Sequence, residues 1–401
     1  MRKAIVMAGG QGSRLQPLTL TRPKPMVPVA NRPVMAHILE WLRGHGFAEV
    51  LVTLYYRADD IRRAFGDGRS LGLKITYRVE EKPLGTAGSV KNAEDWIANE
   101  PVLVASGDAL TDLDLAALQQ RHRETGAWLT LGLKRVPDPS QYGVIELDVR
   151  GCIARFQEKP GAARAISNLA NTGIYCVEPQ VLERVPRGQA YDWSRDVFPQ
   201  LIAEGLPLFG HSLDGYWCDI GSMNDYRRGQ LDALQGAVRV ALPATVVRPR
   251  IWMGPNVRIA PGAVIEGPAL LGAGCRIERD ALVLPGSVIG EHTVIRAGAC
   301  VWNAILGSEC EVGAGAVVRD CVVGEETRVG SACSVTDGAV IGRGCRLTAR
   351  VRIGEGQRVE PDQVLSGAPA PGELARRIPA RRAGVAMPMQ ASGDLLARAG
   401  G

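Results

Sequence analysis

Hydrophobic and polar positions follow two different periods along this chain of 401 residues. Up to about residue 235, short apolar runs alternate with stretches whose apolar residues recur every three or four positions, which predicts strands and helices in turn. Segment 33–43 is an example, because Val34, Ile38 and Leu42 would share one face of a helix. This alternation predicts an α/β layered sheet.

The predicted strands of this part can be read from the apolar runs. They are residues 4–7, 50–54, 73–77, 102–105 and 129–133, followed by the shorter runs 144–147, 152–156 and 172–177. A second helix is expected over 113–123. Open sheets of this class bind ligands at the carboxyl ends of their strands, so those ends are searched first for chemistry.

From about Arg248 the apolar residues recur every six positions. The recurring aliphatic residues are Ile259, Ile265, Leu271, Ile277, Val283, Ile289, Ile295 and Val301, then, after one shortened step, Leu306, Val312 and Val318, and after another Val323, Val329, Val335, Ile341, Leu347, Ile353 and Val359. Four positions beyond each, the residue is often small, and four cysteines occupy such positions. This pattern predicts a parallel β-helix of about six coils with three sides each.

These two patterns divide the chain into an α/β domain over residues 1–236, a linker over 237–250 and a repeat domain over 251–365. A tail rich in Ala, Arg, Gly and Pro follows over 366–401. The flat apolar flank or the open end of a β-helix suits self-association, so we expect a homo-oligomer formed through the repeat domain.

Composition excludes several classes of protein. No apolar stretch approaches a membrane span, and the chain opens on a strand pattern instead of a signal peptide, so we expect a cytoplasmic protein that does not bind membranes. The nine cysteines never form a C-x-x-C pair, which argues against a zinc site or a disulfide framework. The net charge of +5 comes without a basic run interleaved with aromatics, so no nucleic-acid partner is expected.

A glycine-rich turn directly follows the first predicted strand and predicts a phosphate site. Its residues are Ala8, Gly9, Gly10, Gly12 and Ser13. Such a turn exposes backbone N–H groups to phosphate oxygens, and Arg14 and Lys24 add positive charge beside it. The spacing matches neither the P-loop nor the dinucleotide fingerprint.

Together with Pro17-Leu18-Thr19 and Lys24-Pro25, this turn closely resembles the signature of the sugar-1-phosphate nucleotidyltransferases, which make nucleotide sugars. The resemblance implies a Rossmann-like mixed sheet and a left-handed β-helix of hexapeptide repeats. With the repeat domain included, the chain looks most like the mannose-1-phosphate guanylyltransferases, which implies GTP and mannose 1-phosphate as substrates, GDP-mannose as product and pyrophosphate release.

A second segment, Glu80 with Pro83, Gly85, Thr86 and Ala87, corresponds to the part that walls the base and ribose in this family. The resemblance places Glu80 where the base edge is read, with Glu81 as the alternative. A carboxylate offers only acceptors, which match the N1–H and N2–H donors of guanine, whereas uracil or thymine would favour an amide. The segment therefore favours GTP.

Two carboxylates complete the nucleotide side. Asp108 follows a central strand, and Asp219 is the family's second acidic position, so the pair is expected to hold Mg²⁺. On the sugar side the resemblance gives Lys159 to the phosphate of the sugar 1-phosphate and Glu158 to sugar hydroxyls. Gly143, Asn171 and Thr172 are expected to line the hexose pocket. Asp196 is interpreted as a helix-surface charge.

The expected chemistry is a direct displacement without a covalent intermediate, because the attacking phosphate is already ionised at pH 7. Arg14 is assigned to the β- and γ-phosphates and the leaving group, and Lys24 to the α-phosphate. Three alternatives stay open: a glucose-1-phosphate thymidylyl-, uridylyl- or adenylyltransferase, a non-catalytic regulatory paralogue, or an acyltransferase built on the repeat domain, where His292 is the only histidine.

Overall fold

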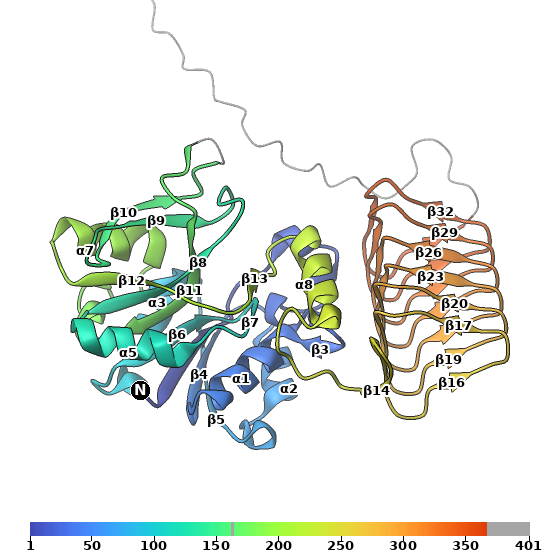
Figure 1. Cartoon of the computed structure of the whole chain (residues 1–401), viewed down its shortest axis with the longest axis horizontal. Coiled ribbons are helices and arrows are strands. Elements are labelled where there is room, and N and C mark those ends of the chain that lie inside the picture. The colour runs from blue at the N-terminus through green and yellow to red at the C-terminus, as the bar shows by residue number, and fades with distance from the viewer. Residues whose placement is uncertain (162–163, 367–401) are drawn as a thin grey trace, which may run out of the picture.

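The computed structural model describes residues 1–161 and 164–366 (Figure 1). An α/β domain occupies the N-terminal part of the chain, and a column of stacked short strands follows it (Figure 1). The predicted tail over 366–401 lies outside the described residues from position 367 onward. Within the described ranges, no helix has the length and apolar character needed to cross a membrane.

The N-terminal domain is built on a mixed sheet with the strand order β10-β9-β11-β6-β1-β4-β5, extended by β8 and β12. The strands are β1 (Lys3–Met7), β4 (Glu49–Leu54), β5 (Lys74–Val79), β6 (Val102–Ser106), β8 (Leu129–Arg135), β9 (Gly143–Leu147), β10 (Ile153–Glu158), β11 (Leu169–Val177) and β12 (Leu208–Ser212). β1 is parallel to β4 and β6, whereas β11 is antiparallel to β6 and β8. The predicted mixed α/β sheet is confirmed.

Helices cover both faces of this sheet. The larger helices are α1 (Val34–Gly44), α2 (Ala58–Phe65), α3 (Gly85–Lys91), α5 (Leu115–Thr125), α7 (Phe198–Ala203) and α8 (Met223–Gln235), with the short α4 (Glu94–Ile97) and α6 (Pro179–Leu182). Alternate residues of β1 face opposite sides: Val6 packs in the core with Leu39 of α1, and Ile5 packs in the other core with Val90 of α3. Both β1 faces are buried, which explains its continuous apolar sequence.

Short elements connect these layers. They are β2 (Pro28–Val29) paired with β3 (Arg32–Pro33), β7 (Ala109–Thr111) paired with β13 (Trp217–Asp219), 3₁₀ turns at Ser13–Leu15, Leu18–Leu20, Lys24–Met26 and Arg69–Leu71, and a π-helical turn at Trp193–Val197. Sequence periodicity gave no signal for them, because each is too short to show a period.

The described C-terminal part is a parallel β-helix whose coils contribute strands to three sheets. The first sheet holds β14 (Thr245–Arg248), β15 (Ile251–Met253), β18 (Ala269–Leu271), β21 (Ser287–Ile289), β24 (Ile305–Leu306), β27 (Val322–Val323), β30 (Val340–Ile341) and β33 (Arg358–Val359). The second holds β16 (Arg258–Ile259), β19 (Arg276–Ile277), β22 (Val294–Ile295), β25 (Glu311–Val312), β28 (Arg328–Val329), β31 (Arg346–Leu347) and β34 (Val364–Leu365). The third holds β17 (Val264–Ile265), β20 (Leu282–Val283), β23 (Cys300–Trp302), β26 (Val317–Arg319), β29 (Ser334–Val335) and β32 (Arg352–Ile353).

The six-residue repeat is confirmed by the strand register. Leu271 pairs with Ile289 one coil of 18 residues further on, whereas Ile289 pairs with Leu306 after only 17. The shortened step therefore leaves the inward stack of aliphatic residues unbroken. The left-handed winding stays a prediction from the resemblance.

The cysteines of the repeat domain fill its interior. Cys275, Cys310, Cys333 and Cys345 are buried in the core of the β-helix, as predicted for small inward positions. Burial raises the pKa of Cys275 to about 11 and that of Cys310 to about 12, so these thiols stay protonated at neutral pH. All nine cysteines of the sequence lie in the described part, and all are free thiols.

One flank of the β-helix packs against the N-terminal domain. Outward-facing residues of the first sheet, Leu270, Val288, Ile305, Val322 and Val340, belong to the same apolar core as the buried residues of α8. Figure 1 shows α8 on the side of the N-terminal domain that faces the β-helix. An apolar flank that could have joined subunits is thus covered within the chain, and self-association through the remaining surface of the β-helix domain stays a prediction.

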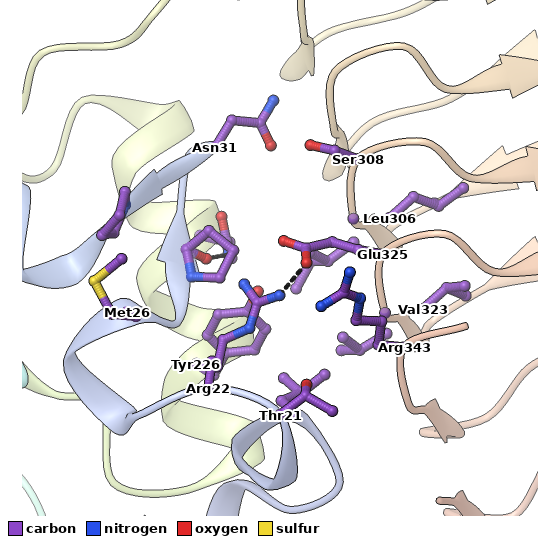
Figure 2. Close-up of a pocket in the computed structure, with 18 residues that line it drawn as sticks. Thr21, Arg22, Met26, Asn31, Tyr226, Leu306, Ser308, Val323, Glu325 and Arg343 are labelled. Carbon is purple, nitrogen blue, oxygen red and sulfur yellow. Dashed lines mark hydrogen bonds and ion pairs between the residues drawn. The ribbon is translucent and has the colours of Figure 1, made fainter. Parts of the chain in front are cut away.

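Polar contacts rim this interface. Arg22 forms an ion pair with Glu325 of the β-helix, and Nδ2 of Asn31 donates to the carbonyl of Ile289 at 2.8 Å. Figure 2 shows Arg22 and Glu325 pointing toward each other from the two domains, beside Arg343. A cavity of about 230 Å³ lies between the two domains at this place.

Candidate active site

A polar cavity of about 340 Å³ opens at the carboxyl edge of the mixed sheet. Many predicted site residues line it: Arg14, Lys24, Thr86, Asp108, Gly143, Glu158, Lys159, Asn171, Thr172 and Asp219. The fold therefore brings together residues that are up to 205 positions apart in the sequence. The remaining predicted nucleotide residues lie in the adjoining glycine-rich turn and in the segment around Glu80.

Strand pairing explains how the two aspartates meet. β1 and β6 are parallel neighbours with Met7 opposite Ser106, so the glycine-rich turn and Asp108 leave the sheet side by side. The β7–β13 pair sets Asp219 opposite Ala109, directly beside Asp108 in the chain. The N–H of Ile220 donates to the carbonyl of Asp108 at 3.1 Å and fixes this approach.

Lys24 joins the two aspartates. Its Nζ lies 2.5 Å from Oδ2 of Asp108 and 3.2 Å from Oδ1 of Asp219. Burial alone would lower the pKa of Lys24, but the two carboxylates outweigh it and raise the pKa to about 12. The ammonium is therefore charged at any physiological pH.

The two carboxylates differ in their environment. Burial favours the neutral form of Asp108, but Lys24 and the hydroxyl of Ser106 outweigh it and hold the pKa of Asp108 below its usual value. Burial raises the pKa of Asp219, the Asp108 carboxylate raises it further, and Lys24 opposes both effects. One ammonium thus neutralises only part of the charge of two carboxylates.

This donor set fits a divalent cation. Carboxylate oxygens suit Mg²⁺, which keeps several waters and takes only one or two protein carboxylates together with substrate phosphates. Asp108 and Asp219 would hold it, because both carboxylates line the cavity and Lys24 occupies only part of their acceptor capacity. In the described residues, no cluster of three or more His, Cys, Asp or Glu side chains forms a metal cage.

Close packing explains the glycine at position 12. Gly12 has a φ of +67°, and a Cβ there would lie 2.8 Å from Cβ of Lys24. A side chain would push Lys24 away from the aspartates. Within the described residues, the backbone N–H groups of Gly9, Gly10 and Gly12 make no backbone hydrogen bond, so they are free for an anionic ligand.

The other residues of the turn frame these groups. Ala8 is buried, and its N–H donates to the carbonyl of Thr53 at 3.0 Å. Ser13 begins the 3₁₀ turn that carries Arg14. A Cβ on Gly221 would lie 2.7 Å from Oδ2 of Asp219 and 3.0 Å from Nη2 of Arg14, so these charged groups converge above this glycine.

The segment after β5 places Glu80 beside the glycine-rich turn. The N–H of Glu80 donates to the carbonyl of Leu54 at 2.8 Å, and a Cβ on Gly9 would lie 3.5 Å from Cβ of Tyr55, the next residue. Oε2 of Glu80 accepts from the N–H of Leu84 at 3.0 Å. Glu80 is 8% exposed, whereas Glu81 is exposed, and the choice between them as the residue that reads the base stays a prediction.

Other predicted residues of this segment make structural contacts. The hydroxyl of Thr86 donates to Oδ2 of Asp192 at 2.7 Å and accepts from the N–H of Trp193 at 3.0 Å. Gly85 has a φ of +70°, and a Cβ there would lie 2.6 Å from the carbonyl of Tyr191. Ala87 is buried and Pro83 is exposed. Their roles in nucleotide binding stay predictions.

The sugar side lies at the ends of β9, β10 and β11. Glu158 pairs with Gly143, and the Nζ of Lys159 lies 3.6 Å from Oε1 of Glu158. Lys159 has a φ of 44°, a conformation that is uncommon for a residue with a side chain and is frequent at functional sites. Its side chain is 56% exposed, and its contact with an incoming phosphate stays a prediction.

The side chains of Asn171 and Thr172 already form hydrogen bonds within the protein. The Nδ2 of Asn171 donates to the hydroxyl of Tyr175, and its Oδ1 accepts from the N–H of Gly173, both at 3.0 Å. The hydroxyl of Thr172 donates to the carbonyl of Gly132 at 2.6 Å. Both residues line the cavity, and their contact with a hexose stays a prediction.

Sequence reasoning missed several residues of the cavity wall. Trp217 lines the cavity and packs edge to face with Tyr142, the neighbour of the predicted Gly143, with ring centroids 5.1 Å apart. Ser194 and Arg195 also line the cavity. Asp192 caps the turn that carries them, accepting from the N–H of Ser194 at 2.9 Å. The signal available was Arg195 itself, which lies next to the Asp196 that we interpreted as surface charge.

Comparison with known proteins identifies the family. The family model described as "Nucleotidyl transferase" matches residues 3–236, and that described as "GMPPB C-terminal domain" matches 265–370. The chain is 39% identical to a UTP–glucose-1-phosphate uridylyltransferase of Synechocystis sp. over 76% of this chain and 82% of that protein. It is 34% identical to a mannose-1-phosphate guanylyltransferase of Mycobacterium tuberculosis over 74% of this chain and 82% of that protein.

Solved structures with a similar fold support the same family. A putative glucose-1-phosphate thymidylyltransferase from Bacillus anthracis, in complex with a sucrose, superimposes with a TM-score of 0.54 and 26% identity, covering 60% of this chain and 97% of that one. HddC from Yersinia pseudotuberculosis complexed with GMP-PN gives a TM-score of 0.51 and 25% identity, covering 57% and 98%. The chain belongs to the nucleotidyl transferase family. Within it, the chain is a sugar-1-phosphate nucleotidyltransferase, and the expected resemblance to the mannose-1-phosphate guanylyltransferases is confirmed.

Proposed function

We propose that this enzyme transfers a guanylyl group from GTP to mannose 1-phosphate, giving GDP-mannose and pyrophosphate. The observation that carries the choice of base is the buried carboxylate of Glu80, which lies beside the glycine-rich turn with Oε2 held by the N–H of Leu84. A fixed carboxylate accepts from two neighbouring donors on a guanine edge, and it would face an unpaired acceptor on uracil or thymine. A similar solved structure that holds GMP-PN adds support.

The reaction is a single displacement. An oxygen of the sugar phosphate forms a bond to the α-phosphorus as the bond from that phosphorus to the β-phosphate oxygen breaks, and pyrophosphate leaves with the bonding electrons. No proton has to move, because the attacking oxygen is ionised. The work of the protein is to align two anions that repel each other and to stabilise the charge on the leaving group.

Fixed cations divide this work. In our assignment Arg14 contacts the β- and γ-phosphates, Lys24 the α-phosphate and Lys159 the incoming sugar phosphate. Lys24 is anchored by Asp108 and Asp219, so its ammonium needs no reorganisation when the nucleotide binds. Mg²⁺ held by these aspartates would neutralise phosphate charge when bound.

The choice of hexose rests on the relatives. The C-terminal match to "GMPPB C-terminal domain" and the guanylyltransferase relatives favour mannose. The 39% identity to a uridylyltransferase named for glucose 1-phosphate supports the second candidate, a UTP–glucose-1-phosphate uridylyltransferase. No residue of the described pocket separates the two sugars by a physical argument.

A substrate matrix tests the proposal. GTP, UTP, dTTP and ATP are each combined with mannose 1-phosphate and glucose 1-phosphate in the presence of Mg²⁺, and pyrophosphate release is measured. We expect the highest kcat/KM with GTP and mannose 1-phosphate. A higher value with UTP and glucose 1-phosphate would replace the proposal with the second candidate, and no turnover with any pair would indicate a regulatory paralogue.

A further inference from the structure

One arginine interrupts an apolar ladder on the β-helix. The outward residues of the first sheet pair coil by coil, and the apolar ones pack with the core of the N-terminal domain. From β15 to β33 they are Trp252, Leu270, Val288, Ile305, Val322, Val340 and Arg358. Apolar packing accounts for the first six, so the charged residue in the last described coil of this sheet needs another explanation.

Arg358 reaches into the glycine-rich signature. Its Nη1 donates to the carbonyl of Arg14 at 3.3 Å and to the carbonyl of Gln16. Both carbonyls lie at the end of the 3₁₀ turn that carries the Arg14 side chain into the active site. Within the described part of the chain, no carboxylate lies within 4.0 Å of the Arg358 guanidinium, so its contacts are directed to the loop backbone.

The environment of Arg358 supports a specific role. The residue is partly buried, and this burial lowers the pKa of its guanidinium. Burying a cation without a carboxylate partner is unfavourable unless its donors are satisfied. Here Nη1 donates to two carbonyls of the loop. By contrast, Arg346 and Arg352, which stand on the outer faces of the other two sheets in neighbouring coils, are exposed.

A second β-helix contact holds the other end of the same loop. Glu325 forms an ion pair with Arg22, two residues before Lys24 (Figure 2). The loop between these contacts consists of short 3₁₀ turns, which have few hydrogen bonds of their own. Arg358 and Glu325 therefore hold the segment 14–24 from outside, at the Arg14 end and the Lys24 end.

We propose that Arg358 is a positioning residue for nucleotidyl transfer: it fixes the backbone at Arg14 and Gln16 so that the Arg14 side chain is held ready for the triphosphate. The repeat domain thereby takes part in the catalytic apparatus. This inference rests on the proposed function and on the role assigned to Arg14. A small displacement of a group that stabilises the transition state can cost about a hundredfold in rate, so loss of the contact should be measurable.

The test uses the full chain with the variants Arg358→Gln, Arg358→Lys and, as a matched control, Arg352→Gln. We expect Arg358→Gln to lower kcat/KM for the nucleoside triphosphate by about tenfold to a hundredfold, with less than a twofold change in KM for the sugar phosphate. Arg358→Lys, which keeps a charged donor, should recover part of the loss. Arg352→Gln should match the parent. Activity of Arg358→Gln equal to that of the parent would overturn the proposal.

A double-mutant cycle separates positioning from general interface support. If Arg358 acts through Arg14, the change Arg358→Gln should lower activity by less than threefold in an Arg14→Ala background. The same factor in both backgrounds would show that Arg358 does not act through Arg14.

Hydrogen exchange supplies a readout that needs no substrate. The amides of Leu15 and Gln16 bond to the carbonyls of Gly12 and Ser13 within the loop. Arg358→Gln should speed their exchange at least tenfold, and amides in the interior of β1 should be unaffected. Unchanged exchange would refute the positioning role even if the proposed substrates prove wrong. If exchange is faster in Arg358→Gln but the parent shows no turnover with the proposed substrates, the proposed function fails and the positioning role stands.

Discussion

The buried cluster of Lys24, Asp108 and Asp219 gives the most direct physical prediction. Lys24→Met replaces the unbranched stem of the lysine with one of similar shape but leaves two neighbouring carboxylates without their ammonium. The pKa of Lys24 rises from 10.5 to about 12, which corresponds to about 2 kcal/mol of favourable interaction. Removing one partner of a buried ion pair costs about 3–5 kcal/mol, and the aspartate side chains keep 25% and 30% exposure, so we expect a loss of about 3 kcal/mol at pH 7.

The loss should depend on pH with a definite sign. The stabilisation carried by Lys24 is complete below pH 10.5 and disappears only above about pH 12, so the parent retains it fully at pH 7. The pKa of Asp108 lies below its usual 3.8 in the parent and should rise above it in Lys24→Met. The variant is therefore penalised most at neutral pH, and its deficit should shrink as the pH falls toward 4.

Calorimetry of the full chain in EDTA measures the stability difference between Lys24→Met and the parent. A loss of about 3 kcal/mol should lower the Tm of the N-terminal domain by about 6–12 °C at pH 7, and by clearly less at pH 4. A shift below about 2 °C at pH 7, or an equal shift at both pH values, would refute the electrostatic reasoning.

Three further changes test the site. Asp108→Asn should stay folded by circular dichroism and lose about a hundredfold in kcat, and parental turnover would remove Asp108 from the catalytic assignment. Glu80→Gln should shift the ratio of kcat/KM for GTP to that for UTP toward UTP. In the parent, burial raises the pKa of Glu80, and guanine donors need its charged form, so this ratio should also fall as the pH is lowered toward that raised pKa. A ratio that responds neither to the substitution nor to pH would exclude Glu80 from base reading. Position 12 has a φ of +67°, and a Cβ there would lie 2.8 Å from that of Lys24, so Gly12→Ala should cost about 1–3 kcal/mol of stability and reduce kcat. Urea unfolding measures the stability and pyrophosphate release measures kcat. A substitution that changes neither would contradict the packing argument.

Long periodic signals made most of the architecture predictable. The stacked aliphatic residues of the β-helix repeat often enough to show their period, and the shortened steps keep the register, as with Ile289 and Leu306. The central strands β1, β4 and β6 were visible as continuous apolar runs because they are buried on both faces. β12 was missed, because His211 and Ser212 interrupt its apolar pattern.

The site was predictable where local motifs carry it. Arg14, Lys24, Asp108, Lys159 and Asp219 line one cavity, as the motifs implied. Contacts between distant segments were not predictable. The hydrogen bond from Thr86 to Asp192, for example, joins two segments that are 106 residues apart in the sequence.

The contact of Arg358 with the catalytic loop also depends on distant segments, but the sequence held a partial signal for it. Outward positions of the first sheet are apolar in every coil from Trp252 to Val340. A comparison of the repeats that allows for the two coils of 17 residues singles out Arg358.

In the proposed reaction, cations at the rim of the N-terminal sheet hold the triphosphate for attack by the sugar phosphate. A crystal structure with GTP and Mg²⁺ tests it most directly. We expect the triphosphate to lie against the N–H groups of Gly9 to Gly12, with Arg14 and Lys24 on its oxygens and the base beside Glu80. A nucleotide bound elsewhere, for example in the cavity beside Arg22 and Arg343, would contradict it.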